Sequence, residues 1–324
     1  MNLLNNSLAG GLVEGFCIIK SIEQRTTQRG QNYLDLVLSD AAGEVNAKLW
    51  DYSEARHGAY TSDEIIKVRG TVDTWNGAPQ LRVERIRKTN DSDDVKYEDL
   101  VDSAPFSSES MYNELLGIVS SFKDTDLKSI MLEILKERRE NLLIWPAAVK
   151  MHHAMRGGLL YHTLSIVKMA QSACKLYTFL DEELLISGAI LHDLAKIEEL
   201  DATENGYASS YTVEGMLLGH LVKGAMDVER VAERLGTPRE LVTLLEHMII
   251  SHHGCPEFGS SIMPMFAEAQ MLALLDDLDA KMFEFASAIE GIGEGDFSAR
   301  QWGLDNRRIY NHGRGGYFKT QVLE

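Results

Sequence analysis

The first part of the chain alternates between apolar and polar residues. This pattern predicts five short strands between residues 11 and 88, with turns at Asp40-Ala-Ala-Gly43 and Asn76-Gly77. A short helix over residues 51–57 is expected between the third strand and the fourth. Because this order of elements is that of an OB-fold barrel, we predict an all-β OB-fold domain over residues 1–90.

The pattern changes beyond residue 90. Residues 91–107 are polar and acidic with a single proline, which is typical of a linker. From 108 to 300 apolar residues recur with the 3.6-residue period of amphipathic helices, which predicts an all-α helical bundle. Residues 301–324 are expected to form a basic C-terminal tail. Two domains are therefore predicted, and the clearest helices of the second cover residues 158–176, 181–194, 212–235, 238–251 and 265–286.

Cysteine usage and hydropathy indicate a cytoplasmic protein. The three cysteines are far apart and form no CxxC pair, which is typical of a reducing compartment. The N-terminus lacks the charged and apolar regions of a signal peptide. No apolar run approaches the roughly 18 residues that a membrane span needs, so we expect no membrane partner.

The formal net charge of −17 argues at first against a nucleic-acid partner. However, residues 1–88 carry 11 lysines and arginines against 11 aspartates and glutamates, so the predicted barrel is neutral. OB-folds commonly bind single strands by stacking bases on aromatic side chains beside cations. Within the barrel we select Tyr33 and Trp75 as candidates for stacking, and Arg69 as a candidate for a phosphate contact.

The most informative motif is His192-Asp193 at the end of an apolar helical run, with Lys196 one turn later. Imidazole and carboxylate together suit a divalent metal ion. Further histidines lie 30 residues before His192 and 28 and 60 residues after it, so the chain can run down one helix and return along another. We predict a metal site in the bundle core, with ligands chosen from His162, His192, Asp193, His220, His252, His253 and Asp276.

Some choices among these ligands stay open. Adjacent helical residues point about 100° apart, so His252 and His253 suit two metal ions better than one. Asp276 shares the apolar face of its helix, and we favour it over Asp277 and Asp279, which would be solvated or lie behind the ligands. If one ion binds, the expected core set is His162, His192, Asp193 and Asp276.

The spacing of these histidines and aspartates resembles the HD superfamily of phosphohydrolases. Residues 146–162, 215–220, 251–264 and 276–281 are similar to the YhaM-type 3′-5′ exoribonucleases, which pair an N-terminal OB-fold with a C-terminal HD domain. The resemblance covers nearly the whole chain. One departure is Ala195, where HD proteins commonly have glycine before the lysine; the added methyl removes no ligand.

The resemblance implies metal-dependent 3′-5′ hydrolysis of single-stranded RNA, with single-stranded DNA as an alternative substrate. One or two divalent ions are expected, with Mn favoured and Co, Fe, Ni, Zn or Mg as alternatives. His192 and Asp193 would anchor the centre, with Asp193 as the bridge, and Lys196 would stabilise charge in the transition state. His152 and His153 are candidates for contacting phosphate or protonating the leaving oxygen, with a packing or surface role as an equal alternative.

Two other functions remain open. The HD centre alone would also permit a nucleotide or cyclic-dinucleotide phosphodiesterase, although the barrel favours a polymer. The residues after Gly254 are Cys255-Pro256-Glu257, which lack the HD-GYP motif of one such class. A nucleic-acid-binding regulatory protein with an inactive centre is the third hypothesis, and the intact ligand set argues against it. The basic tail could contact RNA or a second subunit of a homo-oligomer.

Overall fold

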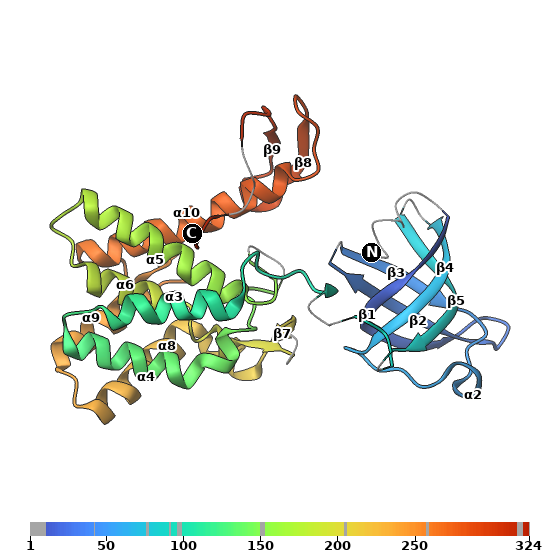
Figure 1. The fold of residues 1–324 in the computed structure, drawn as a ribbon, viewed down its shortest axis with the longest axis horizontal. Helices are drawn as coiled ribbons and strands as arrows, with labels where there is room; N and C mark the ends of the chain where they lie inside the picture. Colours follow the sequence, from blue (N-terminus) through green and yellow to red (C-terminus); the bar gives the residue numbers. More distant parts are fainter. Residues whose placement is uncertain are drawn as a thin grey trace. The chain divides into compact units, whose positions relative to one another are not determined.

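The computed structural model divides into two compact units, Met1–Ser103 and Ala104–Glu324. Figure 1 colours the first unit from blue to teal and the second from green to red. Among the residues that the structure describes, the first unit consists mainly of β-strands with the short helix α2, and the second is mainly helical, which confirms the predicted fold class. The structure describes residues 11–41, 43–75, 78–90, 92–95, 99–149, 153–203, 206–256, 259–315 and 320–323.

Five strands of the first unit close into a barrel in the order β1-β2-β3-β5-β4. β3 pairs with β5 in parallel, and the other neighbours are antiparallel. The short helix α2 lies between β3 and β4 in sequence, so the predicted order of an OB-like barrel is confirmed. The elements are β1 (Leu12–Thr26), β2 (Asn32–Asp40), β3 (Gly43–Leu49), α2 (Glu54–His57), β4 (Ile65–Trp75) and β5 (Ala78–Lys88).

The alternation of side chains determines which face of each strand is buried. On β2, Leu34, Leu36 and Leu38 are buried, whereas Tyr33 and Asp35 between them are only partly covered. Gly70 lies on β4 at an irregularity of its pairing with β5, and a Cβ there would collide with the backbone carbonyl of Arg82. Only glycine permits this close strand approach.

The second unit is a bundle of amphipathic helices. α5 and α6 are buried along most of their length, so they form the centre of the bundle. Within the described segments, no helix has the length and apolar composition required to cross a bilayer. The helices are α3 (Ser108–Ser120), α4 (Thr125–Leu142), α5 (Gly158–Leu176), α6 (Glu182–Leu191), α7 (Lys196–Glu199), α8 (Val213–Leu235), α9 (Arg239–Ser251) and α10 (Ala267–Ile289).

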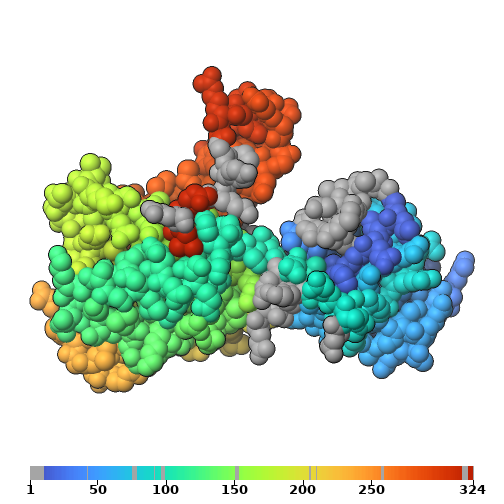
Figure 2. Space-filling model, in the orientation of Figure 1, coloured from blue at the N-terminus to red at the C-terminus, as the bar shows by residue number. Residues whose placement is uncertain are grey.

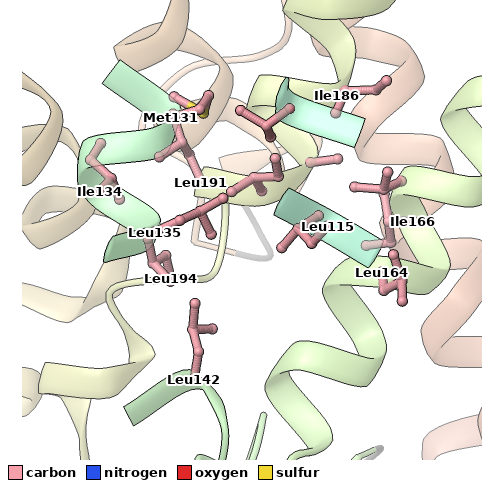
Figure 3. Packing of buried hydrophobic residues seen from close by; sticks show 14 of the residues in the cluster. Leu115, Met131, Ile134, Leu135, Leu142, Leu164, Ile166, Ile186, Leu191 and Leu194 are labelled. Atoms are coloured by element: carbon pink, nitrogen blue, oxygen red, sulfur yellow. The ribbon is translucent and has the colours of Figure 1, made fainter. Parts of the chain in front are cut away.

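Side chains from α3, α4, α5 and α6 interdigitate in the main core (Figure 3). Leu115 of α3, Leu135 of α4 and Ile166 of α5 have no exposed surface, and burying each contributes about 1.5–3 kcal/mol. This packing fixes the axes of α5 and α6 relative to each other. It therefore fixes His162 on α5 and His192, which caps the C-terminus of α6.

Residues 297–310 form regular structure, although the sequence predicted a bundle end at residue 300 followed by a basic tail. β8 (Phe297–Gln301), a 3₁₀ turn (Trp302–Leu304) and β9 (Arg307–Tyr310) form a hairpin at the end of α10 (Figure 2, orange to red). The boundary that we placed after residue 300 thus falls inside a strand. The hairpin forms because Leu304 and Ile309 bury themselves against Ala288 of α10, which a search for long apolar patterns does not detect.

The last described residues also pack against the bundle. Val322 is buried in the main core, and the hydroxyl of Tyr161 donates to the backbone carbonyl of Thr320 at 2.8 Å. A small hairpin of β6 (Leu200–Ala202) and β7 (Ala208–Tyr211), also absent from the sequence prediction, leads into α8.

We expect Leu115→Ala to destabilise the helical unit by about 2–5 kcal/mol, because it leaves a cavity in a fully buried layer. Leu176→Ala is the matched control, since Leu176 is 74% exposed at the end of α5 and should change stability by no more than about 0.5 kcal/mol. Chemical denaturation followed by far-UV circular dichroism measures the helical transition. Equal midpoints for the two variants would contradict the assigned core.

Candidate metal centre

Seven side chains from five helices or helix ends meet in the interior of the bundle. They are the seven ligands selected from the sequence, and the structure brings all of them together. The donor atoms of overlapping groups of three lie within 4.8 Å of one another. The contributors are His162 on α5, His192 and Asp193 after α6, His220 on α8, His252 and His253 after α9, and Asp276 on α10.

Asp193 occupies the middle of this cluster. Its Oδ2 lies 3.6 Å from His162 Nε2 and 3.5 Å from His192 Nε2. Its Oδ1 lies 3.3 Å from His220 Nε2 and 3.6 Å from His252 Nε2. Each carboxylate oxygen therefore faces a different pair of imidazoles, so Asp193 could contribute a donor atom to each of two metal positions.

The spacing of the donor atoms suits a metal ion. Asp276 Oδ1 lies 3.2 Å from His162 Nε2 and 3.8 Å from His192 Nε2. Two ligands that each lie about 2.1 Å from one ion are separated by roughly 3.0–3.4 Å in octahedral or tetrahedral geometry. Small adjustments of these side chains would therefore close the shell around an ion.

Several donor atoms at the centre are buried without a hydrogen-bond partner among the described residues. They are Asp193 Oδ1, His220 Nε2, His252 Nε2 and His253 Nδ1. A buried polar atom without a partner costs about 1–3 kcal/mol. Lone pairs that converge at one point in this way fit a divalent cation, so the residues present satisfy the requirement of a metal site.

Two of the imidazoles are oriented by carboxylates behind them. His162 Nδ1 lies 2.8 Å from Asp279 Oδ2, and His220 Nδ1 lies 2.9 Å from Glu199 Oε2. When Nδ1 donates its proton to such an acceptor, the lone pair of Nε2 points to the metal position. Asp279 and Glu199 therefore fix the tautomer and the direction of these two rings.

Two other imidazoles are oriented by the ends of their own helices. His192 Nδ1 lies 2.9 Å from the carbonyl oxygen of Ala189, and His252 Nδ1 lies 2.7 Å from that of Ile249. The last carbonyls of a helix lack an intrahelical partner. A histidine just beyond the helix end can therefore satisfy one of them while it turns Nε2 toward the centre.

A kink in α8 places His220. Gly219 has φ 69° and ψ 165° inside an otherwise helical segment, a conformation that side chains disfavour. The kink brings the backbone N–H of His220 within 3.3 Å of Glu199 Oε1, while the other oxygen of Glu199 accepts from the ring. Gly219 thus lets one carboxylate hold both the backbone and the imidazole of His220.

The sequence left Asp279 open as a solvated group or one behind the ligands, and the structure places it behind His162. This carboxylate is 4% exposed and contacts His153 Nε2 and His162 Nδ1, each at 2.8 Å, and it accepts a hydrogen bond from the hydroxyl of Ser165. These partners hold the pKa of Asp279 well below its usual range although burial opposes its charge. The three-residue spacing from Asp276 places both on one helix face, which was a usable signal.

His153 differs from its predicted role as a phosphate contact. It is fully buried behind His162, and burial lowers its pKa even though Asp279 favours the proton. A phosphate group cannot reach this position without displacing the core, so the structure makes His153 part of the support for His162. The other candidate, His152, lies outside the described residues.

Lys196 lies beside the central carboxylate, with Nζ 2.6 Å from Asp193 Oδ2. Burial disfavours the charged amine, but Asp193, Asp276 and Glu199 outweigh it and raise the pKa of Lys196. The same contact opposes the burial penalty on Asp193 and keeps the pKa of that carboxyl well below its usual range. Lys196 is therefore a fixed positive charge at the edge of the centre.

His253 differs from the other imidazoles because it is only partly buried. Burial and the neighbouring rings of His252 and His220 lower the pKa of His253 to about 4. At neutral pH its ring is therefore unprotonated, which is the form that binds a metal ion.

The barrel carries a separate aromatic patch, which consists of Tyr33, Trp50 and Lys48. The rings of Tyr33 and Trp50 are 4.7 Å apart between centroids, and Trp50 is 41% exposed. Lys48 Nζ lies 5.0 Å from the Tyr33 centroid. The predicted Arg69 is on β4, which does not pair with β2, and the side chain of Trp75 lies outside the described residues.

Comparison with known protein families places this centre in a class. A model of the HD domain matches residues 159–281, and a model described as a putative helicase matches residues 109–189. Fold and site together define an enzyme of the metal-dependent HD phosphohydrolase class, joined to an OB-like barrel. Among solved structures, a replication protein A heterotrimer bound to ssDNA is similar over 25% of this chain and 59% of the matched chain, at 15% identity. The TM-score of 0.21 is too low to define a shared fold.

Two curated relatives identify the family. The 3'-5' exoribonuclease YhaM of Geobacillus sp. (strain WCH70) is 36% identical over 301 residues, which are 93% of this chain and 92% of the relative. The enzyme of the same name from Bacillus subtilis (strain 168) is 35% identical over 301 residues, which are 93% and 95% of the two chains. The chain belongs to the YhaM family of 3′-5′ exoribonucleases.

We expect Asp279→Asn to weaken metal binding by about 10–100-fold, because His162 would lose the carboxylate that orients it. Asp277→Asn is the control, since Asp277 is exposed on the same helix and pairs only with Lys281 at 2.6 Å in the described contacts. Titration of the metal-free proteins with Mn²⁺ by calorimetry measures the difference. Identical affinities would show that Asp279 does not position the ligand.

Proposed function

We propose that the protein is a metal-dependent 3′-5′ exoribonuclease that hydrolyses the phosphodiester bonds of single-stranded RNA at this centre. The observation that carries the proposal is Asp193, whose two oxygens face two different pairs of imidazoles in a chain of the YhaM family. Single-stranded DNA is a second substrate that the same chemistry would accept.

The ligands divide into two sets that share Asp193. His162, His192 and Asp276 would complete one metal position, and His220, His252 and His253 the other. A bound divalent ion would neutralise negative charge on the phosphoryl oxygens and lower the pKa of an attacking water. The mixture of imidazole and carboxylate favours Mn, with Co, Fe, Ni, Zn and Mg as alternatives.

Lys196 would act on the substrate directly. Its ammonium is held at the edge of the centre by Asp193 and stays charged at neutral pH. Negative charge grows on the non-bridging oxygens during phosphodiester hydrolysis, and a fixed cation next to them stabilises the transition state. Asp193 would therefore hold the ammonium of Lys196 in place and also act as a metal ligand.

The aromatic patch would hold bases of the RNA. Stacking on Tyr33 and Trp50 tolerates every base, because each has a π-face. Lys48 is held beside the patch by Asp35 at 3.2 Å, and it adds a cation for the phosphate backbone. An exonuclease that digests RNA of any sequence needs this tolerance, because every base must pass through the same site.

The test of the proposed function uses metal-stripped protein and 5′-labelled single-stranded RNA, with Mn²⁺, Mg²⁺, Co²⁺, Fe²⁺, Ni²⁺ and Zn²⁺ added in turn. We expect a ladder that shortens from the 3′ end only when an ion is present. Asp193→Asn keeps the shape of the side chain and removes its charge, so its rate should fall by about 10³-fold or more. Products are resolved on a sequencing gel.

Asp277→Asn serves again as the control and should digest RNA at the wild-type rate, because its side chain is exposed and pairs with Lys281. Digestion by Asp193→Asn at that same rate would refute the metal centre. Intact RNA under every ion, with hydrolysis of mononucleotides or cyclic dinucleotides instead, would replace the exoribonuclease by a nucleotide phosphodiesterase.

We expect Trp50→Ala to raise the KM for RNA by about 5–100-fold with little change in kcat, because stacking of a base contributes about 1–3 kcal/mol to binding. Trp302→Ala is the matched control, since Trp302 is 77% exposed on the C-terminal hairpin. Initial rates over a range of RNA concentrations separate KM from kcat. A lower kcat at unchanged KM would assign Trp50 a role other than stacking.

A further inference from the structure

The outer surface of the barrel has a hollow of about 510 Å³ that the proposed function does not use. It is lined by residues of β1, β4, β5 and α2. The Tyr33–Trp50 pair belongs to other segments, because Tyr33 is on β2 and Trp50 follows the end of β3. This basic hollow is named after the five cationic side chains that line it, Arg56, Lys67, Arg69, Arg85 and Arg87.

The charge of the basic hollow opposes that of the whole chain. Two carboxylates of the lining, Glu14 and Glu84, accompany the five cations, and Asp93 outside it pairs with Arg87, which leaves an excess of two positive charges. The chain as a whole has a net charge of −17. A concave cluster of one sign in a molecule of the other sign attracts anions to that place.

The cations face one another across two strands. In the register of β4 and β5, Lys67 is opposite Arg87, and Arg69 is opposite Arg85. Like charges directly opposite in an antiparallel pair destabilise the sheet. The arrangement therefore lowers the stability of the barrel in the absence of a ligand, and an anion between the strands would remove the repulsion.

Intramolecular carboxylates neutralise only part of this charge. Glu14 lies 3.3 Å from Lys67 Nζ and 3.9 Å from Arg69 Nη1, and Asp93 holds Arg87 at 2.6 Å. Among the residues that the structure describes, no carboxylate lies within 4 Å of Arg56 or Arg85. These two exposed guanidinium groups remain available as paired donors for an oxyanion.

The lining favours phosphate over base. It contains no phenylalanine, tyrosine or tryptophan, and the ring of its histidine, His57, packs at 5.8 Å against Tyr52. Bases would find no open ring to stack on, whereas guanidinium groups match the geometry of phosphate oxygens.

We propose that the basic hollow binds the phosphodiester backbone of the RNA, at a segment separate from the bases that stack on Tyr33 and Trp50. This inference rests on the proposed function, because it takes the exoribonuclease substrate as its ligand. The two sites lie on different strands, and in this proposal an RNA of a few nucleotides binds at the aromatic patch alone, whereas a longer RNA reaches both sites. The hollow would then strengthen the binding of long substrates and leave short ones unaffected.

The test compares wild-type protein with Arg69→Gln/Arg85→Gln by fluorescence anisotropy, using the full chain freed of metal so that RNA stays intact. For RNA of about 20 nucleotides, we expect the affinity to fall by about tenfold and the slope of log K against log salt to shrink by about 1.4, which is about 0.7 for each lost phosphate contact. For RNA of about four nucleotides, the affinity should not change.

The melting temperature provides a second readout. Removal of Arg69 and Arg85 relieves a repulsion, so the melting temperature should stay equal or rise while RNA binding falls. Arg234→Gln/Arg239→Gln is the matched control, because it makes the same change of charge at two exposed arginines on the helical unit. It should retain the wild-type affinity and salt slope.

Three results would overturn the inference. Unchanged binding of the long RNA would show that the hollow does not contact it. An equal loss in the control would show an effect of net charge alone, and an equal loss for long and short RNA would show a ligand of one or two nucleotides. A failure of the proposed function would be seen separately, as intact RNA in the metal-loaded wild-type protein.

Discussion

The interior of the helical unit depends on one buried negative charge. Asp193 is 2% exposed, and a carboxylate at such a position is tolerated only when charge or hydrogen bonds compensate its lost hydration. The structure surrounds it with Lys196 and with imidazoles from four directions. α6, α8 and α9 end or kink where their imidazoles reach this carboxylate, whereas His162 reaches it from within α5.

Backbone features at the helix ends meet this requirement. α6 and α9 end one residue before His192 and His252, and the carbonyls that their last turns leave free orient the two rings. α8 reaches the centre by a different device, because Gly219 interrupts the helix just before His220. The positions of His192, His220 and His252 are therefore determined by the ends of α6 and α9 and by the kink in α8. The buried leucine and isoleucine side chains around α5 and α6 hold these helices in place.

Much of this centre could be predicted from the sequence, because ligand types and helix spacing are local properties. The seven ligands and the element order of the barrel follow from alternation, period and spacing. Glu199 was not assigned, and Asp279 was left between a solvated position and one behind the ligands, because their roles depend on distances to His220 and His162 that only the folded bundle defines. The choice between a phosphate role and a packing role for His153 stayed open for the same reason, since nothing in its sequence neighbourhood shows that Phe283 and Tyr161 cover it.

The charge distribution explains why the two units need each other. Outside residues 1–88 the chain carries 21 lysines and arginines against 38 aspartates and glutamates, so a polyanion meets a repulsive surface on most of the helical unit. Lys196 and the metal positions offset this repulsion only at the point of hydrolysis. Under the proposed function, the barrel would hold the rest of the RNA strand, because it carries a cationic hollow and an aromatic patch although its total charge is neutral. The barrel would then supply the affinity for a polyanion that the acidic surface of the helical unit does not provide.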